Sequence, residues 1–359
     1  MSEPRLLLVR HGDRRGRLPD YLGGALAQIG RSRPSLHRRL RLHETGDPLP
    51  DLDDVVAVVF WLADPLREHF PGCFEEASAI AADASARGAV LVNPPSALSN
   101  TIKSVQAAIW QQAGIPTPYH HRFESRDDLD HLLGSVPLPA LVRADEHHAQ
   151  HSMRLCRRRR DLRRLPRGFR YPGTLSPLVD ARAGYRDARP NTMWAHYHHK
   201  KRAYVLGSRV LAGEIFFAQS PIVSSSTCTF HRYSGSTAFL APLAPRLPRE
   251  RQALAADVEF GVAGNPPAEL LQRASQALGL AFVAIDYADL ADGRAVLWEA
   301  NPHFHLPPVE QMFLPAQRRL AERNSVLEEG VADFLEELCG PSGAPIADVK
   351  TSEGDANEE

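Results

Sequence analysis

The sequence has few cysteines and no paired cysteine motif. Its 359 residues include four cysteines, Cys73, Cys156, Cys228 and Cys339, which stand far apart. This spacing excludes a C-x-x-C zinc site and offers no disulfide framework. No apolar run approaches the roughly 20 residues of a membrane helix, and the run Leu6–Val9 is too short for a signal peptide. We therefore expect a cytoplasmic protein that has no membrane partner.

The sequence also has no excess of charge of either sign. Lysine and arginine number 42 and aspartate and glutamate 43, which gives a formal net charge of −1 at pH 7. A chain so nearly neutral has no overall field that would attract nucleic acid or an anionic membrane. The apolar content of 43% and the charged content of 24% are ordinary for a globular protein. The length allows two or three domains of about 100–200 residues each.

Residues 1–95 alternate short apolar runs with a helical pattern. The runs are short and mostly apolar, which is typical of buried parallel strands. They are Leu6–Val9, Val55–Trp61 and Ala89–Val92. Glu75–Arg87 carries apolar residues at helical spacing, and Gly88 follows it as a C-terminal cap. This order of elements predicts a small open α/β domain.

After Asn93-Pro94-Pro95 the pattern becomes mixed, and we expect an α+β arrangement. Helices are predicted near residues 99–113, 268–278 and 317–338, and strands near 141–143, 280–286 and 296–300. A hairpin is predicted over 203–212 with Gly207-Ser208 at its turn, and Asp292-Gly293 makes a second turn. Residues 144–190 are predicted to be irregular, and the acidic segment 340–359 to be disordered.

Three polar residues stand on the two predicted strands that Asp292-Gly293 joins. Asp286 ends one apolar run, and Glu299 and Asn301 follow in the next. Side chains alternate along a strand, so Glu299 and Asn301 point to one face, with Asp286 on the adjoining strand. Magnesium takes oxygen ligands, usually one or two carboxylates together with substrate phosphates. We therefore predict that these three residues bind Mg²⁺; acidic residues beside a surface strand are the alternative explanation.

Asp286 followed by Glu299-Ala300-Asn301-Pro302 resembles the metal-binding end of the ATP-grasp fold. The resemblance covers most of residues 90–305 and includes Asn100–Lys103 and Ala113–Pro118, which are similar to the family's "N-K, helix, A-G-I-P-x-P" entry. It implies an ATP-dependent ligase that uses ATP and one or two Mg²⁺ ions. It also implies that Lys103 binds nucleotide phosphate, since a lysine can offset the charge of a triphosphate.

The segment Arg202–Ala212 is similar to a hairpin of the peptide-type carboxylate–amine ligases, the branch of ribosomal protein S6 glutamate ligase and glutathione synthetase. The resemblance implies a catalytic role for Arg202 at the transferred phosphoryl group or its acyl acceptor, because a guanidinium binds two oxygens at once. The hinge that holds adenine in the family falls at Met193–Tyr197. The residues that this position assigns to the nucleotide are Trp194, Ala195, His196 and Tyr197.

Two segments depart from the family pattern. Arg143 stands where the family has a lysine, which keeps the charge at the phosphates but changes reach and geometry. The resemblance implies a binding and catalytic role for it. The family then has a glycine-rich loop whose backbone N–H groups hold phosphate, but Ala144–Ser152 contains no glycine. Its three histidines either contact phosphate or are polar loop residues. Arg232, in a segment partly similar to a substrate-facing loop of the family, is a further candidate.

The resemblance also implies a division of the chain. A pre-ATP-grasp α/β domain would span residues 1–95, the first ATP-grasp lobe 96–190 and the second lobe, with the metal site, 191–339. ATP would lie between the lobes, and a small-molecule carboxylate would become an acyl phosphate that an amine attacks. An amino acid or short peptide is the preferred nucleophile. Many proteins of this fold are dimers or tetramers, so a homodimer is compatible with the resemblance.

Three alternatives remain open on the sequence alone. A kinase of the same fold would phosphorylate a small molecule. The nine arginines between Arg154 and Arg170 could hold nucleic-acid phosphates without turnover, bind an anionic substrate or form a solvated face, and they lack the interleaved aromatics of a single-strand groove. Leu6–Gly12 is similar to the L-V-R-H-G opening of histidine phosphatases, but no second His-Gly motif follows at the end of a strand.

Overall fold

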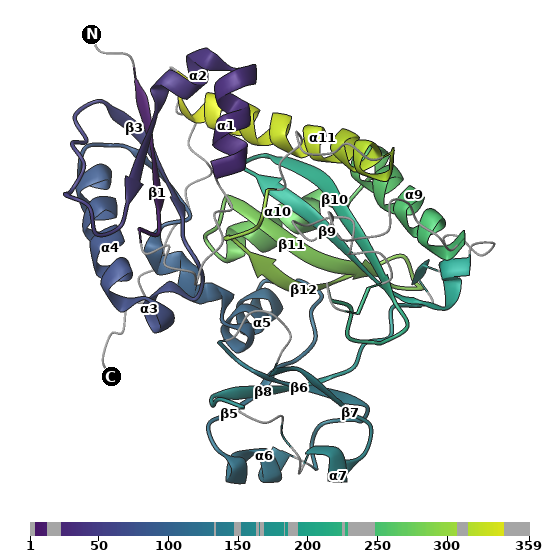
Figure 1. Cartoon of the computed structure of the whole chain (residues 1–359). Coiled ribbons are helices and arrows are strands. Elements are labelled where there is room, and N and C mark those ends of the chain that lie inside the picture. The colour runs from purple at the N-terminus through teal and green to yellow at the C-terminus, as the bar shows by residue number, and fades with distance from the viewer. Residues whose placement is uncertain are drawn as a thin grey trace.

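The computed structural model describes residues 4–12, 23–132, 134–146, 152–162, 165, 169–182, 184–185, 193–224, 227–228, 248–306 and 315–340. These residues contain three four-stranded sheets that follow one another along the chain (Figure 1). The first sheet is parallel and the other two are antiparallel. The predicted combination of an α/β part with α+β parts is therefore confirmed.

The first sheet is buried on both faces, which explains its continuous apolar strands. Its order is β2-β1-β3-β4, and its strands are β1 Arg5–Arg10, β2 Leu40–Glu44, β3 Val55–Trp61 and β4 Val90–Val92. Its helices are α1 Gly23–Ser32, α2 Pro34–Arg39, α3 Leu66–His69 and α4 Pro71–Ala86. Leu7 and Val9 pack in one cluster with α4, whereas Leu6 and Leu8 pack in another with α1. Strand β2 has no predicted counterpart, because its sequence LRLHE is half polar.

His11 lies directly after β1 and is held by the backbone. Its Nε2 accepts a hydrogen bond from the backbone N–H of Ala63 at 2.8 Å, and its ring packs on Phe70. Burial, followed by the nearby His303, lowers the pKa of His11 to about 4. A phosphatase nucleophile needs a free ring nitrogen among phosphate-binding arginines, whereas Arg10 pairs with Glu44 at 2.5 Å. The described geometry therefore favours a structural role for the Leu6–Gly12 motif.

The second sheet has the order β5-β8-β6-β7. Its strands are β5 His121–Phe123, β6 Ala140–Ala144, β7 Arg154–Cys156 and β8 Gly173–Pro177, and the short helices α6 Arg126–Leu132 and α7 Arg159–Leu162 cover its outer face (Figure 1). The prediction that residues 144–190 are irregular is therefore wrong at β7, α7 and β8. Strand β7 was not predicted from the sequence, because only Cys156 in it is fully buried and it therefore shows no apolar pattern.

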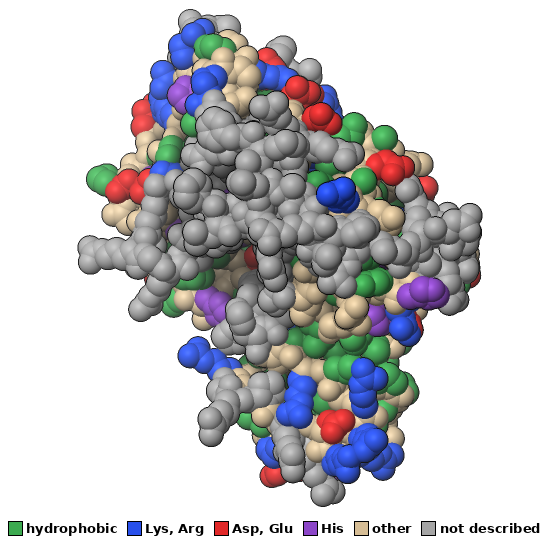
Figure 2. All heavy atoms as spheres, turned by 45° about the vertical axis from the view of Figure 1, so that its right-hand side comes forward, with side chains coloured by type: hydrophobic (Ala, Val, Ile, Leu, Met, Phe, Trp, Pro, Cys, Tyr) green, Lys and Arg blue, Asp and Glu red, His purple; other side chains and the backbone are tan. Residues whose placement is uncertain are grey.

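Basic side chains gather on the lobe of this second sheet (Figure 2). The four arginines Arg157–Arg160 are exposed, and the carboxylate of Asp161 accepts hydrogen bonds from the backbone of Arg157 and Arg158. Three more arginines of the run, Arg163, Arg164 and Arg167, lie outside the described residues. The described part of the run thus has the exposure of a solvated face.

The third sheet has the order β10-β9-β11-β12 and carries the predicted hairpins. Its strands are β9 His198–Leu206, β10 Arg209–Ala218, β11 Phe282–Asp289 and β12 Ala295–Asn301. Its helices are α9 Pro248–Ala263, α10 Ala268–Ala277 and α11 Pro315–Leu338. Gly207, at the turn between β9 and β10, has φ +61°, which a residue without a Cβ adopts readily. Strand β11 extends beyond the predicted strand, so Asp286 lies inside it and not at its end.

Helix α11 ties the first sheet to the third. It runs along the top of the third sheet to α1 and α2 (Figure 1), where Asp333 pairs with both Arg33 at 2.5 Å and Arg209 at 2.6 Å. Leu6 of β1, Phe282 of β11 and Phe334 of α11 belong to one buried cluster. The two sheets therefore share a core, which fixes their relative position more firmly than the partly exposed ion pairs do. Among the described helices, none has the length and hydropathy needed to cross a membrane.

Candidate functional site

Helix α5 (Lys103–Gln112), which follows the 3₁₀ turn η1 (Pro95–Thr101), lies between the second and third sheets. At its first turn, the backbone N–H of Ser104 donates to the buried carboxylate of Asp145 at 2.8 Å, directly after β6. On its inner face, the amide oxygen of Gln106 accepts the backbone N–H of Ala300 in β12 at 2.9 Å. Helix α5 is thus fastened to both sheets, and it holds Lys103 at the point where they meet.

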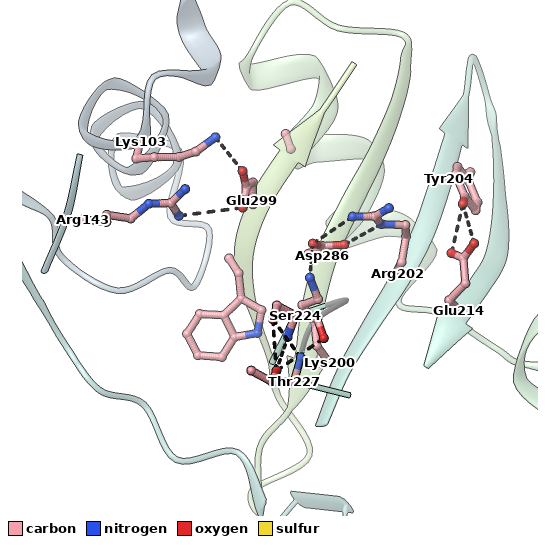
Figure 3. Close-up of polar contacts among 12 residues, drawn as sticks. Lys103, Arg143, Lys200, Arg202, Tyr204, Glu214, Ser224, Thr227, Asp286 and Glu299 are labelled. Atoms are coloured by element: carbon pink, nitrogen blue, oxygen red, sulfur yellow. Dashed lines mark hydrogen bonds and ion pairs between the residues drawn. The ribbon is translucent and has the colours of Figure 1, made fainter. Parts of the chain in front are cut away.

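Two positively charged side chains, Lys103 and Arg143, lie against Glu299 of β12 at this junction (Figure 3). Lys103 Nζ lies 2.8 Å from Glu299 Oε1, and Arg143 Nη1 of β6 lies 3.8 Å from Glu299 Oε2. The side chain of Lys103 is only 2% exposed, and its ammonium also donates to the carbonyl of Thr101 at 3.1 Å. A buried ammonium requires such partners, since desolvation of an unpaired charge is costly.

Asp286 of β11 receives two further cations (Figure 3). Arg202 Nε donates to Asp286 Oδ1 at 2.7 Å and Arg202 Nη2 to Oδ2 at 3.1 Å, while Lys200 Nζ lies 2.7 Å from Oδ2. The pKa of Asp286 is lowered, because the attraction of Arg202 and Lys200 outweighs the effect of burial. The pKa of Arg202 is raised, because Asp286 stabilises its charged form. Asp286 is therefore ionised at neutral pH.

The three predicted metal ligands share one face of the third sheet. Asp286 pairs in register with Glu299 on β12 and with Arg202 on β9, and Asn301 follows Glu299 by two residues. The Nδ2 of Asn301 is buried without a hydrogen-bond partner in the described part of the chain, so no protein group there fixes this amide. The same part contains no cluster of three or more His, Cys, Asp or Glu side chains arranged to hold a metal ion. Two carboxylates and an amide suit a magnesium ion that takes its remaining ligands from phosphate and water.

A cleft of about 830 Å³, including its open mouth, runs between the second and third sheets. Apolar residues of its wall include Leu141, Met153, Leu178, Val179, Ile222 and Val223. The wall also contains the charged side chains of Arg143, Lys200, Asp286 and Glu299. Leu141 and Arg143 face the cleft because they alternate along β6 with Val142, which is in the core.

Three of the four residues assigned to the predicted adenine hinge have described side chains. Trp194, in the 3₁₀ turn η3 (Met193–His196), is 1% exposed and stacks on Phe217 at 5.0 Å. Tyr197 packs edge-on against Trp194, and His196 is exposed. The side chain of Ala195 lies outside the described residues. Trp194, His196 and Tyr197 do not line the cleft, whose wall includes Ser176–Val179 and Ala181, where β8 leaves the second sheet. The family resemblance assigned Trp194 to the nucleotide by its position, whereas its apolar ring is buried in a core cluster.

The remaining predicted residues differ in where they lie. Arg143 lines the cleft, whereas Lys103 does not, because its ammonium is directed to Glu299 and Thr101. Most of the glycine-free segment, residues 147–151, and Arg232 lie outside the described residues.

A second buried network, absent from the sequence prediction, lies beside Arg202. Tyr204, two residues further along β9, donates its hydroxyl to Glu214 of β10 at 2.9 Å (Figure 3). Glu214 also lies 3.9 Å from Arg323 of α11, which pairs with the buried Asp257 of α9. Tyr204 and Arg202 are two residues apart and therefore share a face of β9. This spacing is the sequence signal from which the position of Tyr204 beside Arg202 could have been predicted. The network thus links charged side chains of α9 and α11 to Glu214 and Tyr204, which lie beside Arg202 at the edge of the site.

Comparison with known proteins gives no match at the level of sequence: no family model and no curated protein matches the chain. Solved structures do match over almost the whole length. The ATP-grasp ligase PsnB, bound to a variant precursor, Mg and ADP, is 16% identical, with 94% of this chain and 99% of that one covered and a TM-score of 0.54. The VanG D-Ala:D-Ser ligase from Enterococcus faecalis is 12% identical, with 94% and 100% covered and a TM-score of 0.54. The D-alanyl-alanine synthetase A from Vibrio cholerae is 11% identical, with 94% and 99% covered and a TM-score of 0.52.

The chain has the ATP-grasp fold. The resemblance found in the motifs around Lys103, Arg202 and Glu299 is thereby borne out at the level of architecture. At identities this low the likeness establishes the fold alone, because one fold hosts many activities. The chemistry must therefore be argued from the residues at the cleft.

Proposed function

We propose that this ATP-grasp protein is a magnesium-dependent ligase that uses ATP to join a carboxylate to an amine. The observation that carries the proposal is a cleft whose lining combines apolar residues with the charged side chains of Arg143, Lys200, Asp286 and Glu299. An apolar wall suits a nucleobase, and cations beside carboxylates suit a metal-bound triphosphate. Ligases of the same fold, two of which join amino acids according to their names, support the reaction class. The division of the chain at residues 95, 190 and 339 is part of this proposal.

The metal component of the proposal rests on Asp286, Glu299 and Asn301. These residues would hold Mg²⁺ through carboxylate and amide oxygens, and the bound ion would offset charge on the β- and γ-phosphates. In the absence of ligand, the charges of Asp286 and Glu299 are balanced by Lys200, Arg202, Lys103 and Arg143. The carboxylate of Asp286 is therefore ionised, and it becomes available to a cation when Lys200 shifts toward the phosphates while Arg202 stays in place.

The chemical steps assign a role to Arg202. A substrate carboxylate oxygen attacks the γ-phosphorus, the bond to the β-phosphate oxygen breaks, and ADP leaves. Arg202 uses Nε and Nη2 for Asp286 and keeps Nη1 to donate to the resulting acyl phosphate. A neutral amine then attacks the acyl carbon, inorganic phosphate departs with the C–O bond electrons, and the amine loses a proton. Splitting the condensation in this way replaces one difficult step by two easier ones.

Hydroxylamine trapping tests this proposal without knowledge of the natural amine. The protein is incubated with MgATP, hydroxylamine and a panel of amino acids and short peptides as carboxylates, and hydroxamate, ADP and AMP are measured. We expect hydroxamate in equal amounts with ADP for at least one carboxylate, and loss of both in Asp286→Asn. Hydroxamate with AMP would instead indicate an acyl adenylate. A phosphorylated substrate without any hydroxamate would indicate a kinase and overturn the proposal.

A further inference from the structure

His120 is a histidine of the cleft wall that no motif identifies. It lies just before β5, at the end of the Pro116–Pro118 segment, and it lines the cleft together with Pro118 and Arg143. Its neighbour His121 is the first residue of β5, pairs with Leu175 of β8, and does not line the cleft. Of these two adjacent histidines, only His120 has access to the proposed nucleotide site, so His121 can serve as its control.

The surroundings of His120 are charged, yet its Nδ1 has no hydrogen-bond partner in the described part of the chain. Arg143, Lys103 and Glu299 all act on the imidazole electrostatically, and burial together with the two cations lowers the pKa of His120 to about 3. The ring is therefore neutral and keeps one N–H donor. Its Nδ1 is buried without a hydrogen-bond partner among the described residues. A buried polar atom left in this way needs an explanation, because an unmade hydrogen bond is costly.

The phosphate end of the cleft also needs another donor. The ammonium of Lys103 is committed to Glu299 and Thr101 and does not line the cleft. The segment Ala144–Ser152 has no glycine with which to wrap its backbone N–H groups closely around phosphate. Arg143 is the cation of the second sheet that faces the cleft, and His120 lies beside it.

We propose that His120 is a phosphate-binding residue, which turns a ring N–H toward a phosphate oxygen of the bound nucleotide next to Arg143. The assignment deepens the proposed function and rests on it, because it requires nucleotide phosphates at this end of the cleft. An imidazole at the cleft wall suits this place, since a ring N–H can donate a hydrogen bond to a phosphate oxygen next to Arg143. The polyphosphate would complete the hydrogen bonding that the protein leaves open at this ring.

Calorimetric titration of the full-length protein tests the assignment with two probes, the ATP analogue AMP-PNP with MgCl₂ and adenosine, which has no phosphate. His120→Phe keeps ring volume but removes both nitrogens, His120→Asn restores an N–H donor, and His121→Phe is the matched control. We expect His120→Phe to weaken AMP-PNP binding about tenfold, as for the loss of one hydrogen bond to a charged group, and to leave adenosine binding within twofold. His120→Asn should recover part of the loss, and His121→Phe should bind as the wild type does.

The outcomes separate this assignment from the proposed function. If the wild type binds AMP-PNP and His120→Phe binds it equally well, the assignment fails and the proposed function stands. Equal weakening of AMP-PNP and adenosine would mean that His120 shapes the pocket and does not contact phosphate, which also overturns the assignment. If the wild type binds neither probe, the proposed function fails and the assignment with it. Thermal unfolding of each variant verifies that a lost affinity is not a lost fold.

Discussion

Lys103 and Glu299 form an ion pair of 2.8 Å between helix α5 and strand β12, and the ammonium is almost completely buried. The pair joins helix α5 to strand β12, which carries two of the three proposed metal ligands, Glu299 and Asn301. A charge in this position cannot be left alone, so the two residues depend on each other. The same pair keeps Lys103 out of the cleft and directs Glu299 toward Arg143.

This pair should contribute strongly coupled stability. We expect Lys103→Met to lower the free energy of unfolding by roughly 3 kcal/mol, because it removes the ammonium that pairs at 2.8 Å with a largely buried carboxylate. The double variant Lys103→Met/Glu299→Gln should lose less than the sum of the two single variants, as urea denaturation would measure. Asp130→Asn, which removes the exposed pair with Arg126 on α6, is the control and should cost at most about 0.5 kcal/mol. Additive losses from Lys103 and Glu299 would contradict the coupling.

Asp286 and Asp289 lie on the same strand and provide a matched pair for the metal site. Asp286 faces Arg202 and Lys200, whereas Asp289 pairs with Lys201. We expect Asp286→Asn to raise the Mg²⁺ concentration needed for half-maximal AMP-PNP binding about tenfold, since one carboxylate ligand is lost. Binding without Mg²⁺ should not weaken, because the cations around Asp286 remain. Asp289→Asn should behave as the wild type does; an equal effect of both variants would remove Asp286 from the metal site.

We propose that adenine lies against the apolar residues of the cleft, which include Val179 but not Trp194. Substitutions at these two residues should therefore have opposite effects on stability and on nucleotide binding. Trp194→Leu should lower the free energy of unfolding by roughly 2–4 kcal/mol, because it opens a cavity against Phe217. The affinity of the remaining folded protein for AMP-PNP should be unchanged. Val179→Arg places a long cation in the apolar wall of the cleft and should weaken AMP-PNP binding at least tenfold with little effect on unfolding. If Trp194→Leu weakened AMP-PNP binding and Val179→Arg did not, the hinge would lie at residues 193–197 after all.

His199 makes stability depend on pH. It is 3% exposed, both ring nitrogens are buried without hydrogen-bond partners among the described residues, and burial, followed by Lys201, lowers its pKa to about 4. Below the ordinary histidine pKa of about 6.5, His199 binds a proton in the unfolded chain but not in the folded protein. The free energy of unfolding therefore falls as the pH drops from about 6.5 to 4.

Replacing this ring tests the linkage. His199→Phe should make the slope of unfolding free energy against pH shallower by up to about 1.4 kcal/mol per pH unit within that window. Urea denaturation at several pH values measures the slope, and the exposed His196, changed to Phe, is the control. An unchanged slope in His199→Phe would show that the pKa of this imidazole is the same in the folded and the unfolded protein, which would contradict the linkage.

Local patterns in the sequence predicted most elements that bury a regular face. The strand Val55–Trp61 has the predicted bounds, and α10 and α11 differ from theirs by one or two residues, because each has continuous or periodic apolar positions. The turn at Gly207 was predicted because a positive φ favours glycine there. Strands β7 and β8 were missed because each is short and contains polar residues, and their place in a sheet depends on partners distant in the sequence.

The sequence by itself determined which residue types stand at the ends of the motifs: a period-two spacing of Glu299 and Asn301, an arginine at 202 and a lysine at 103. Only the tertiary structure decided what they face. It brought Asp286 into register with Glu299 and Arg202, turned Lys103 into a partner of Glu299, buried Trp194 and left His120 at the cleft. Sequence spacing fixes direction within one strand or helix, whereas contact between elements depends on how their apolar faces pack together.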